Sequence, residues 1–200
     1  MRRIAVTAAA VAAAVALAGC GGGTSNTAPT STTSVAAPTS AVADGEHNNS
    51  ADVTFAQGMI PHHEQAIEMA KLAATRAESP EVKALASQIQ AAQDPEINEM
   101  KAWLSSWGEP TTMPNDMSHG GHMSGPMSSD DMAKLEGLSG SAFDREFLTM
   151  MTAHHQGAIE MAKTEQANGR YEPAKAMAAD IIRAQSEEIT KMTELLKSIQ

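Results

Sequence analysis

Histidine pairs with neighbouring methionines are the residues of this chain best suited to metal chemistry, and the chain contains the pattern twice. The first copy is FAQGMIPHHEQAIEMAK (55–71) and the second is FLTMMTAHHQGAIEMAK (147–163). Corresponding residues lie 92 positions apart, since 154 − 62 = 92. Thioether sulfur favours Cu(I), and imidazole also accepts Cu(II). The candidate ligands in the two copies are Met59, His62, His63, Met69, Met151, His154, His155 and Met161.

If both copies are helical, their histidines and methionines share the face that carries small residues. At about 100° per residue, with Met59 at zero, the histidine pair lies within about 60° and Met69 at about −80°. Ala66 lies between them, and Glu68 falls on the opposite side. The small, apolar face of such a helix turns inward. We therefore expect the His and Met side chains to point into the core, and Glu68 and its counterpart Glu160 to face solvent.

The inward orientation fits two interpretations. Methionine on an inner helix face is often ordinary core packing, and a single buried histidine can be satisfied by a carbonyl or a water molecule. Four inward imidazoles are harder to satisfy, because each needs partners for both ring nitrogens and an apolar core supplies few. A soft metal bound by imidazole and thioether would satisfy them. We favour metal ligation and keep structural polar contacts as the alternative.

A second group of candidate ligands lies between the two copies. The stretch MPNDMSHGGHMSGPM (113–127) is rich in Gly, Pro and Ser, so its methionines and histidines have no place in a packed core. Met and His in such a setting suit copper, and similar spacing occurs in extracytoplasmic copper-handling proteins. A low-complexity linker that happens to carry these residues is the alternative. The additional candidates are Met117, His119, His122 and Met123.

The N-terminus has the pattern of a bacterial lipoprotein signal. A basic start, MRR, is followed by an Ala/Val-rich apolar run and by LAGC (17–20), which resembles a lipobox. This predicts a signal peptide over 1–19 and lipid attachment at Cys20, and the alternative is an ordinary signal peptide or an uncleaved anchor. Residues 20–50 are rich in Gly, Ser, Thr, Ala and Pro and predict a flexible tether. The expected location is the outer face of the cytoplasmic membrane or the cell envelope.

Charge and motifs narrow the range of functions. Without the two arginines of the signal, 12 basic residues stand against 24 acidic ones, a formal charge of 12 − 24 = −12. Such a chain is a poor nucleic-acid binder and is compatible with cations. If the one cysteine is lipidated, the mature protein has no free thiol, which excludes disulfides and thiol catalysis. The sequence contains no H-E-x-x-H, C-x-x-C-H or G-x-S-x-G motif, and we expect no enzymatic activity.

The composition predicts an all-α fold. Aromatic residues make up 3% of the chain against 42% apolar residues, which favours helices packed through small and flexible side chains. Capping signals predict long helices over 52–77, 79–107, 141–168 and 173–200, and a short one over 130–138. The 92-residue match continues past the histidine pairs. The domain (51–200) is therefore expected to be a four-helix bundle of two hairpins, 52–108 and 141–200, joined by a linker, 109–140.

The doubled M-x-x-H-H-x-x-A-I-E-M-A pattern resembles the family of domains of unknown function numbered 305. The resemblance covers residues 52–200. It implies a ferritin-like four-helix fold in a secreted or membrane-anchored bacterial protein. Some members of that family are implicated in copper binding and tolerance. The resemblance therefore implies that the His and Met residues of the two copies are the metal ligands.

Together these features predict a lipid-anchored, extracytoplasmic protein that sequesters or hands on Cu(I) or Cu(II). The expected partners are a metal ion and the membrane, through Cys20, with no nucleic acid. A homo-oligomer and a separate copper-receiving protein both stay open. A metal-independent scaffold module of the cell envelope is the first alternative. A metal-dependent oxidoreductase that uses the same residues is the second.

Overall fold

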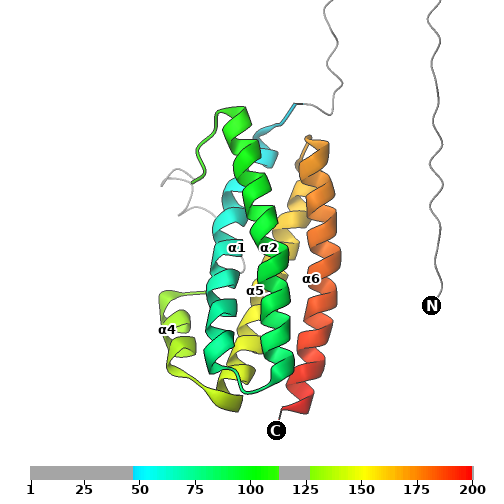
Figure 1. The fold of residues 1–200 in the computed structure, drawn as a ribbon. Helices are drawn as coiled ribbons and strands as arrows, with labels where there is room; N and C mark the ends of the chain where they lie inside the picture. The colour runs from blue at the N-terminus through cyan, green and yellow to red at the C-terminus, as the bar shows by residue number, and fades with distance from the viewer. Residues whose placement is uncertain (1–46, 113–126, 200) are drawn as a thin grey trace, which may run out of the picture. The chain divides into compact units, whose positions relative to one another are not determined.

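The computed structural model describes residues 47–112 and 127–199, and these residues form five α-helices without a strand (Figure 1). The helices are α1 (Ser50–Arg76), α2 (Pro80–Trp107), α4 (Ser129–Gly137), α5 (Gly140–Asn168) and α6 (Glu172–Ser198). The long helices form two hairpins, α1 with α2 and α5 with α6, and the hairpins meet mainly where α1 packs on α5. The predicted all-α bundle of two duplicated hairpins is confirmed.

Local capping chemistry sets the helix ends close to the predicted positions. The side chain of Asn49 accepts from the first amides of α1, and the Asp52 side chain accepts from the Asn49 amide, which completes a capping box. Ser79 caps α2 and is followed by proline in the first turn. Gly108 ends α2 with a φ of 74°, in the left-handed region that favours glycine. The predicted short helix is α4, shifted by one residue.

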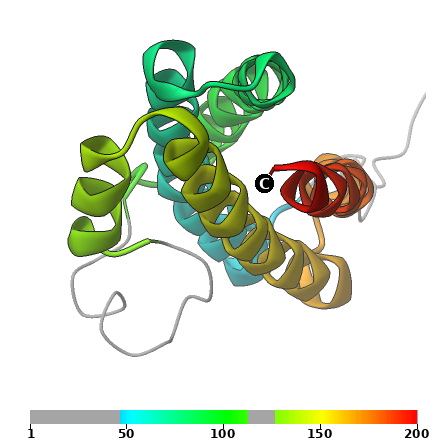
Figure 2. The ribbon, with the colours of Figure 1, turned by 90° about the horizontal axis from the view of Figure 1, so that it is seen from below.

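The core consists of two clusters along the bundle. Figure 2 shows α4 on the side of the bundle opposite α6, and α4 contributes Leu135 to the first cluster. The largest buried side chains of the first cluster are Met69, Leu85, Ile89, Leu135, Phe143, Phe147, Leu148 and Met151. The second cluster includes Met59, Ile97, Met100, Trp103, Leu104, Ala158 and Ile181. Both copies of the repeated helix therefore contribute side chains to the core between the hairpins.

Two buried aspartates hold the hairpins together by the same contact used twice. Asp52 Oδ1 accepts from the amides of 170–171 in the α5–α6 turn, at 3.0 and 2.9 Å. Asp144 accepts from the amides of 78–79 in the α1–α2 turn, at 3.1 and 2.8 Å. All these positions obey the repeat offset, since 144 − 52 and 170 − 78 both equal 92. The first helix of each repeat thus fixes the turn of the other repeat.

Glu165 breaks this symmetry beside Asp52. It is buried, with 1% of its surface exposed, and the equivalent position in the first repeat is Ala73. Burial and then the hydrogen bond and charge of Asp52 raise the pKa of Glu165 to about 8. Ionised, neither of its oxygens has a donor among the described residues. Protonated, Glu165 can donate to Asp52, whose pKa is lowered because this bond and the backbone amides outweigh the effect of burial.

The carboxyl pair makes the free energy of unfolding depend on pH between about 4.5 and 8. The pKa of Glu165 is raised from 4.5 to about 8, so the folded state binds the extra proton, and stability falls as pH rises through this window and levels off above it. We expect Glu165→Gln, which donates to Asp52 at every pH, to lack the fall between about pH 6.5 and 8. Urea unfolding at several pH values measures it, with Glu136→Gln on the exposed face of α4 as control. An unchanged fall in Glu165→Gln would contradict this assignment.

Candidate metal centre

The four histidines of the two copies lie buried at the interface of α1 and α5. His62 has 2% of its surface exposed, and the other three have none. The rings of His62 and His154 pack on each other, with centroids 3.7 Å apart and planes inclined by 41°. The centroids of His154 and His155 are 6.5 Å apart. The fold therefore brings histidines 92 residues apart in sequence into one cluster that both repeats share.

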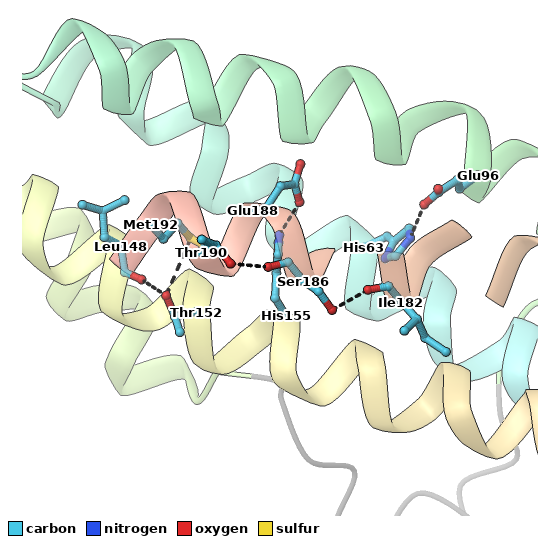
Figure 3. A network of polar contacts seen from close by, with 10 residues as sticks. All are labelled: His63, Glu96, Leu148, Thr152, His155, Ile182, Ser186, Glu188, Thr190 and Met192. Atoms are coloured by element: carbon cyan, nitrogen blue, oxygen red, sulfur yellow. Dashed lines mark hydrogen bonds and ion pairs between the residues drawn. The ribbon is translucent and has the colours of Figure 1, made fainter. Parts of the chain in front are cut away.

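Each repeat also contributes a glutamate that holds one histidine. His63 Nε2 lies 2.7 Å from Glu96 Oε2, and His155 Nε2 lies 2.7 Å from Glu188 Oε2. Figure 3 shows both pairs, each joining a histidine of one helix to a glutamate of its hairpin partner. The sequence interpretation missed both glutamates. The signal that could have found them is the repeat offset, because 188 − 96 is also 92.

Six imidazole nitrogens of this cluster have no hydrogen-bond partner among residues 47–112 and 127–199. We refer to them as the open nitrogens. They are both ring nitrogens of His62, both of His154, and Nδ1 of His63 and of His155. Leaving a buried polar group unsatisfied costs about 1–3 kcal/mol. A buried group of imidazole nitrogens without partners is therefore suited to bind an ion that accepts nitrogen ligands.

The glutamates decide which nitrogen of two histidines is free to bind. A carboxylate accepts a hydrogen bond, so Glu96 and Glu188 place the ring proton on Nε2 of His63 and His155. This leaves Nδ1 of each ring as a bare lone pair. A carboxylate behind a histidine in this way is the usual support for a metal-binding imidazole, because it fixes the tautomer and raises the basicity of the ring.

Burial keeps the central histidines neutral. The pKa of His62 is lowered to about 3, first by burial and then by the repulsion that a proton on His63 or His155 would exert. The pKa of His154 is lowered further, by burial and by the same repulsion from a proton on any of the other three histidines. Neutral imidazole is the form that binds a metal. At pH 5–7 a metal would therefore displace no proton from His62 or His154.

These lowered pKa values also predict how the metal-free protein responds to acid. The unfolded chain takes up protons near pH 6.5, whereas folded His62 takes one up near pH 3. Stability is therefore full above pH 6.5 and falls as pH drops toward 3, by up to about 1.4 kcal/mol per pH unit for each such histidine. We expect urea unfolding to show this slope in the wild-type chain and not in a His62→Leu/His154→Leu variant. Equal slopes would contradict it.

The structure buries the predicted methionine ligands with one exception. Met59, Met69 and Met151 have no exposed surface. Met161 is partly exposed and packs at the border of the second cluster, so its predicted inward orientation is wrong in part. Met161 and its equivalent Met69 lie at about −80° on the helical wheel, at the edge of the inner face. Met69 is nevertheless buried, in the first core cluster, to which α4 contributes Leu135.

No group of three or more His, Cys, Asp or Glu side chains arranged to hold a metal ion is found in the described ranges. The centre is therefore not a preformed site built from these four residue types alone. The uncharged donors that α1 and α5 carry into the core are the imidazole nitrogens and the thioethers of Met59, Met69 and Met151. Buried, soft and free of charged ligands at its middle, this set fits a soft monovalent ion such as Cu(I).

The other predicted site residues lie outside the described residues. These are Cys20 in the signal region, and Met117, His119, His122 and Met123 between the repeats. The two described ends of that linker are both tied to α1. Gln57 donates to the Pro110 carbonyl at 2.8 Å, and Gln65 exchanges two bonds with the Met127 backbone, at 2.9 and 2.7 Å. The linker therefore begins and ends on either side of the first histidine pair.

Comparison with known proteins agrees with this fold. A family model described as a domain of unknown function (DUF305) matches residues 52–196. The chain belongs to the DUF305 family. The predicted family membership is confirmed.

No helix in the described ranges is both long enough and apolar enough to cross a membrane.

Solved DUF305 structures share the fold. A DUF305 protein from Streptomyces coelicolor, thought to be secreted, is 33% identical with a TM-score of 0.69, over 74% of this chain and 93% of that one. A DUF305 fragment from Deinococcus radiodurans is 31% identical with a TM-score of 0.68, over 75% and 97%. An uncharacterised protein of Acanthamoeba polyphaga mimivirus is 45% identical over 53 residues, so the match spans 26% of this chain and about a third (35%) of that protein.

The similar structures include a metal-bound protein. CopM in its Cu(I)-bound form is 36% identical to this DUF305 chain with a TM-score of 0.61, over 74% of this chain and 96% of that one. CopM has also been solved in Cu(II)-bound and Ag-bound forms, at 37% and 36% identity. A protein of the same fold thus binds the soft metals that the donor set of the centre suits.

Proposed function

We propose that this DUF305 protein binds copper, Cu(I) foremost, and sequesters it or hands it on outside the cytoplasm. The observation that carries the proposal is the set of six open nitrogens in one buried cluster. Part of their cost to the metal-free fold is offset when an ion takes up the one lone pair that each neutral ring carries. Thioethers of Met59 and Met151 are the matching sulfur donors, since both are fully buried in the same repeated helices. The copper-bound and silver-bound CopM structures support the choice of metal.

We propose binding rather than catalysis. The four histidines are at most 2% exposed, so a reacting organic substrate could reach them only if the core opened. The middle of the centre holds no carboxylate in a position to move protons, because Glu96 and Glu188 are engaged by the outer histidines. Storage or transfer of the ion needs only the buried ligands, whereas an oxidoreductase would also need access for a second substrate.

The proposed setting is the cell envelope. Lipidation at Cys20 and the tether over 20–50 would hold the domain near the outer face of the membrane. The Met/His-rich linker would act as a looser collecting site with Met117, His119, His122 and Met123. The anchoring of both linker ends on α1, at Gln57 and Gln65, would keep that collecting site near the bundle.

A metal-independent scaffold is the second candidate, and the His–Glu pairs favour it. Each pair ties the two helices of one hairpin together at 2.7 Å, which is a structural contact whether or not a metal binds. The scaffold interpretation leaves the open nitrogens of His62 and His154 unexplained, and for that reason we place it second.

Competition for Cu(I) tests the proposed function directly. The mature chain, with the linker residues Met117, His119, His122 and Met123 replaced by serine, is titrated with Cu(I) against a chromophoric chelator. We expect one ion to be held by the bundle alone. The control is the same chain with all four bundle histidines replaced by leucine. Equal competition by both proteins would favour the scaffold and contradict copper binding in the bundle.

A further inference from the structure

A groove runs between α2 and α6 at the side of the bundle. It has a volume of about 310 Å³, and α2 and α6 make few contacts with each other compared with the pairs α1–α2 and α5–α6. Its lining is Glu96 and Glu99 from α2, with Pro173, Ala176, Met177 and Asp180 from α6. Three carboxylates and one thioether therefore face a space large enough for a hydrated ion.

The groove is joined directly to the buried centre. Glu96, which lines it, has 24% of its side chain exposed, and its Oε2 lies 2.7 Å from Nε2 of His63. His63 has no exposed surface and carries an open nitrogen at Nδ1. The Glu96 side chain is thus partly exposed and is also bonded to a histidine of the cluster, a contact that Figure 3 draws.

The equivalent positions of the other repeat have different chemistry. Subtracting or adding 92 pairs Glu96 with Glu188, but it pairs Glu99 with Lys191 and Asp180 with Gln88. The thioether of Met177 is replaced by Leu85. The buried histidines and Glu96 are duplicated, whereas the carboxylates of Glu99 and Asp180 and the thioether of Met177 have no counterpart of the same chemistry in the other repeat. Symmetry of the centre therefore does not extend to the route that leads to it.

We propose that the groove between α2 and α6 is where the metal cation enters and leaves the buried histidine cluster, with Glu96, which lines the groove and holds His63, at its inner end. This deepens the proposed function and rests on it. Carboxylates at a partly enclosed groove raise the local concentration of cations and speed their association. Asp180 also pairs with Arg183 at 2.9 Å, so Glu96 and Glu99 supply most of the attraction. The thioether of Met177 offers a soft cation its first sulfur ligand inside the groove.

Matched tryptophan substitutions test the route. Ala176→Trp fills the groove, and Ala84→Trp adds the same bulk at the equivalent exposed position of the other repeat. The rate of Ag(I) uptake is followed by stopped flow in the mature chain that has its linker ligands replaced by serine. We expect Ala176→Trp to slow uptake and release by about fivefold or more, with Ala84→Trp within about twofold of the parent. The equilibrium affinities should agree within about threefold.

A charge substitution adds an independent measurement. Glu99→Lys gives the groove the residue that the other repeat has at this position, and Glu136→Lys on α4 makes the same charge change away from it. We expect Glu99→Lys to slow uptake most at low salt, and Glu136→Lys to change it little. Equal rates in all variants, with binding retained, or equal slowing by both tryptophans, would overturn the proposed route alone. Failure of the parent protein to bind Ag(I) would overturn the proposed function as well.

Discussion

Replacing His62 and His154 together by leucine is expected to abolish tight copper binding while leaving the metal-free protein at least as stable. The two rings pack on each other at 3.7 Å and carry four of the open nitrogens. Leucine has a similar volume and no polar atom to satisfy. Relief of the unsatisfied groups should raise the free energy of unfolding by about 1–3 kcal/mol, less any cavity term. Cu(I) affinity should fall by about 100-fold or more.

Urea unfolding with and without Ag(I) measures both effects in one experiment. A 100-fold loss of affinity removes about 2.7 kcal/mol of metal-induced stabilisation. The matched control is Met100→Leu, a buried change on α2 that keeps the volume nearly constant and removes none of the candidate ligands. If the double leucine variant were strongly destabilised and kept its metal-induced stabilisation, the histidines would be structural and the account of the centre would be wrong.

Removing the carboxylate of Glu96 or Glu188 is expected to weaken metal binding by about 10- to 100-fold. Each carboxylate holds the proton of its histidine on Nε2 at 2.7 Å. In Glu96→Leu or Glu188→Leu the ring loses its acceptor, so the tautomer and orientation that expose Nδ1 are no longer fixed. The measurement is the Cu(I) dissociation constant by chelator competition, with metal-free stability recorded in parallel.

The glutamine variants separate positioning of the histidine from simple packing. Glu96→Gln can still accept the Nε2 proton through its amide oxygen but lacks the charge. We expect its affinity to lie between that of the wild type and that of Glu96→Leu. A structural role alone predicts that the metal-free stability changes and the affinity does not. That outcome, seen at both glutamates, would remove them from the metal site.

Much of the fold follows from short-range patterns in the sequence. Asn49, Ser79 and Gly108 cap their helices as their residue types predict, because capping depends on neighbours within one turn. The repeat offset of 92 residues predicts two hairpins. The inner face of each repeated helix also follows from the helical wheel, with Met161 at its edge as the exception.

The contacts of the metal centre that could not be predicted from the sequence depend on how the helices pair. The contact of His62 with His154 requires α1 and α5 to cross at the histidine pairs, which no local pattern determines. Whether the histidines form one shared cluster or two separate ones was open until that crossing was seen. In the sequence alone, Glu96 and Glu188 cannot be distinguished from ordinary polar residues on the outer face of a helix. Their place behind His63 and His155 follows from the register within each hairpin.

The central claim is that the metal binds at the buried histidines that both repeats share. Its most direct test is NMR of the mature chain with ¹⁵N-labelled imidazoles, titrated with up to one equivalent of Ag(I). We predict that the ring nitrogens of His62 and His154 shift first and together, while the Nε2 protons of His63 and His155 remain in place. Shifts confined to His119 and His122 of the linker, with His62 and His154 unchanged, would contradict the account.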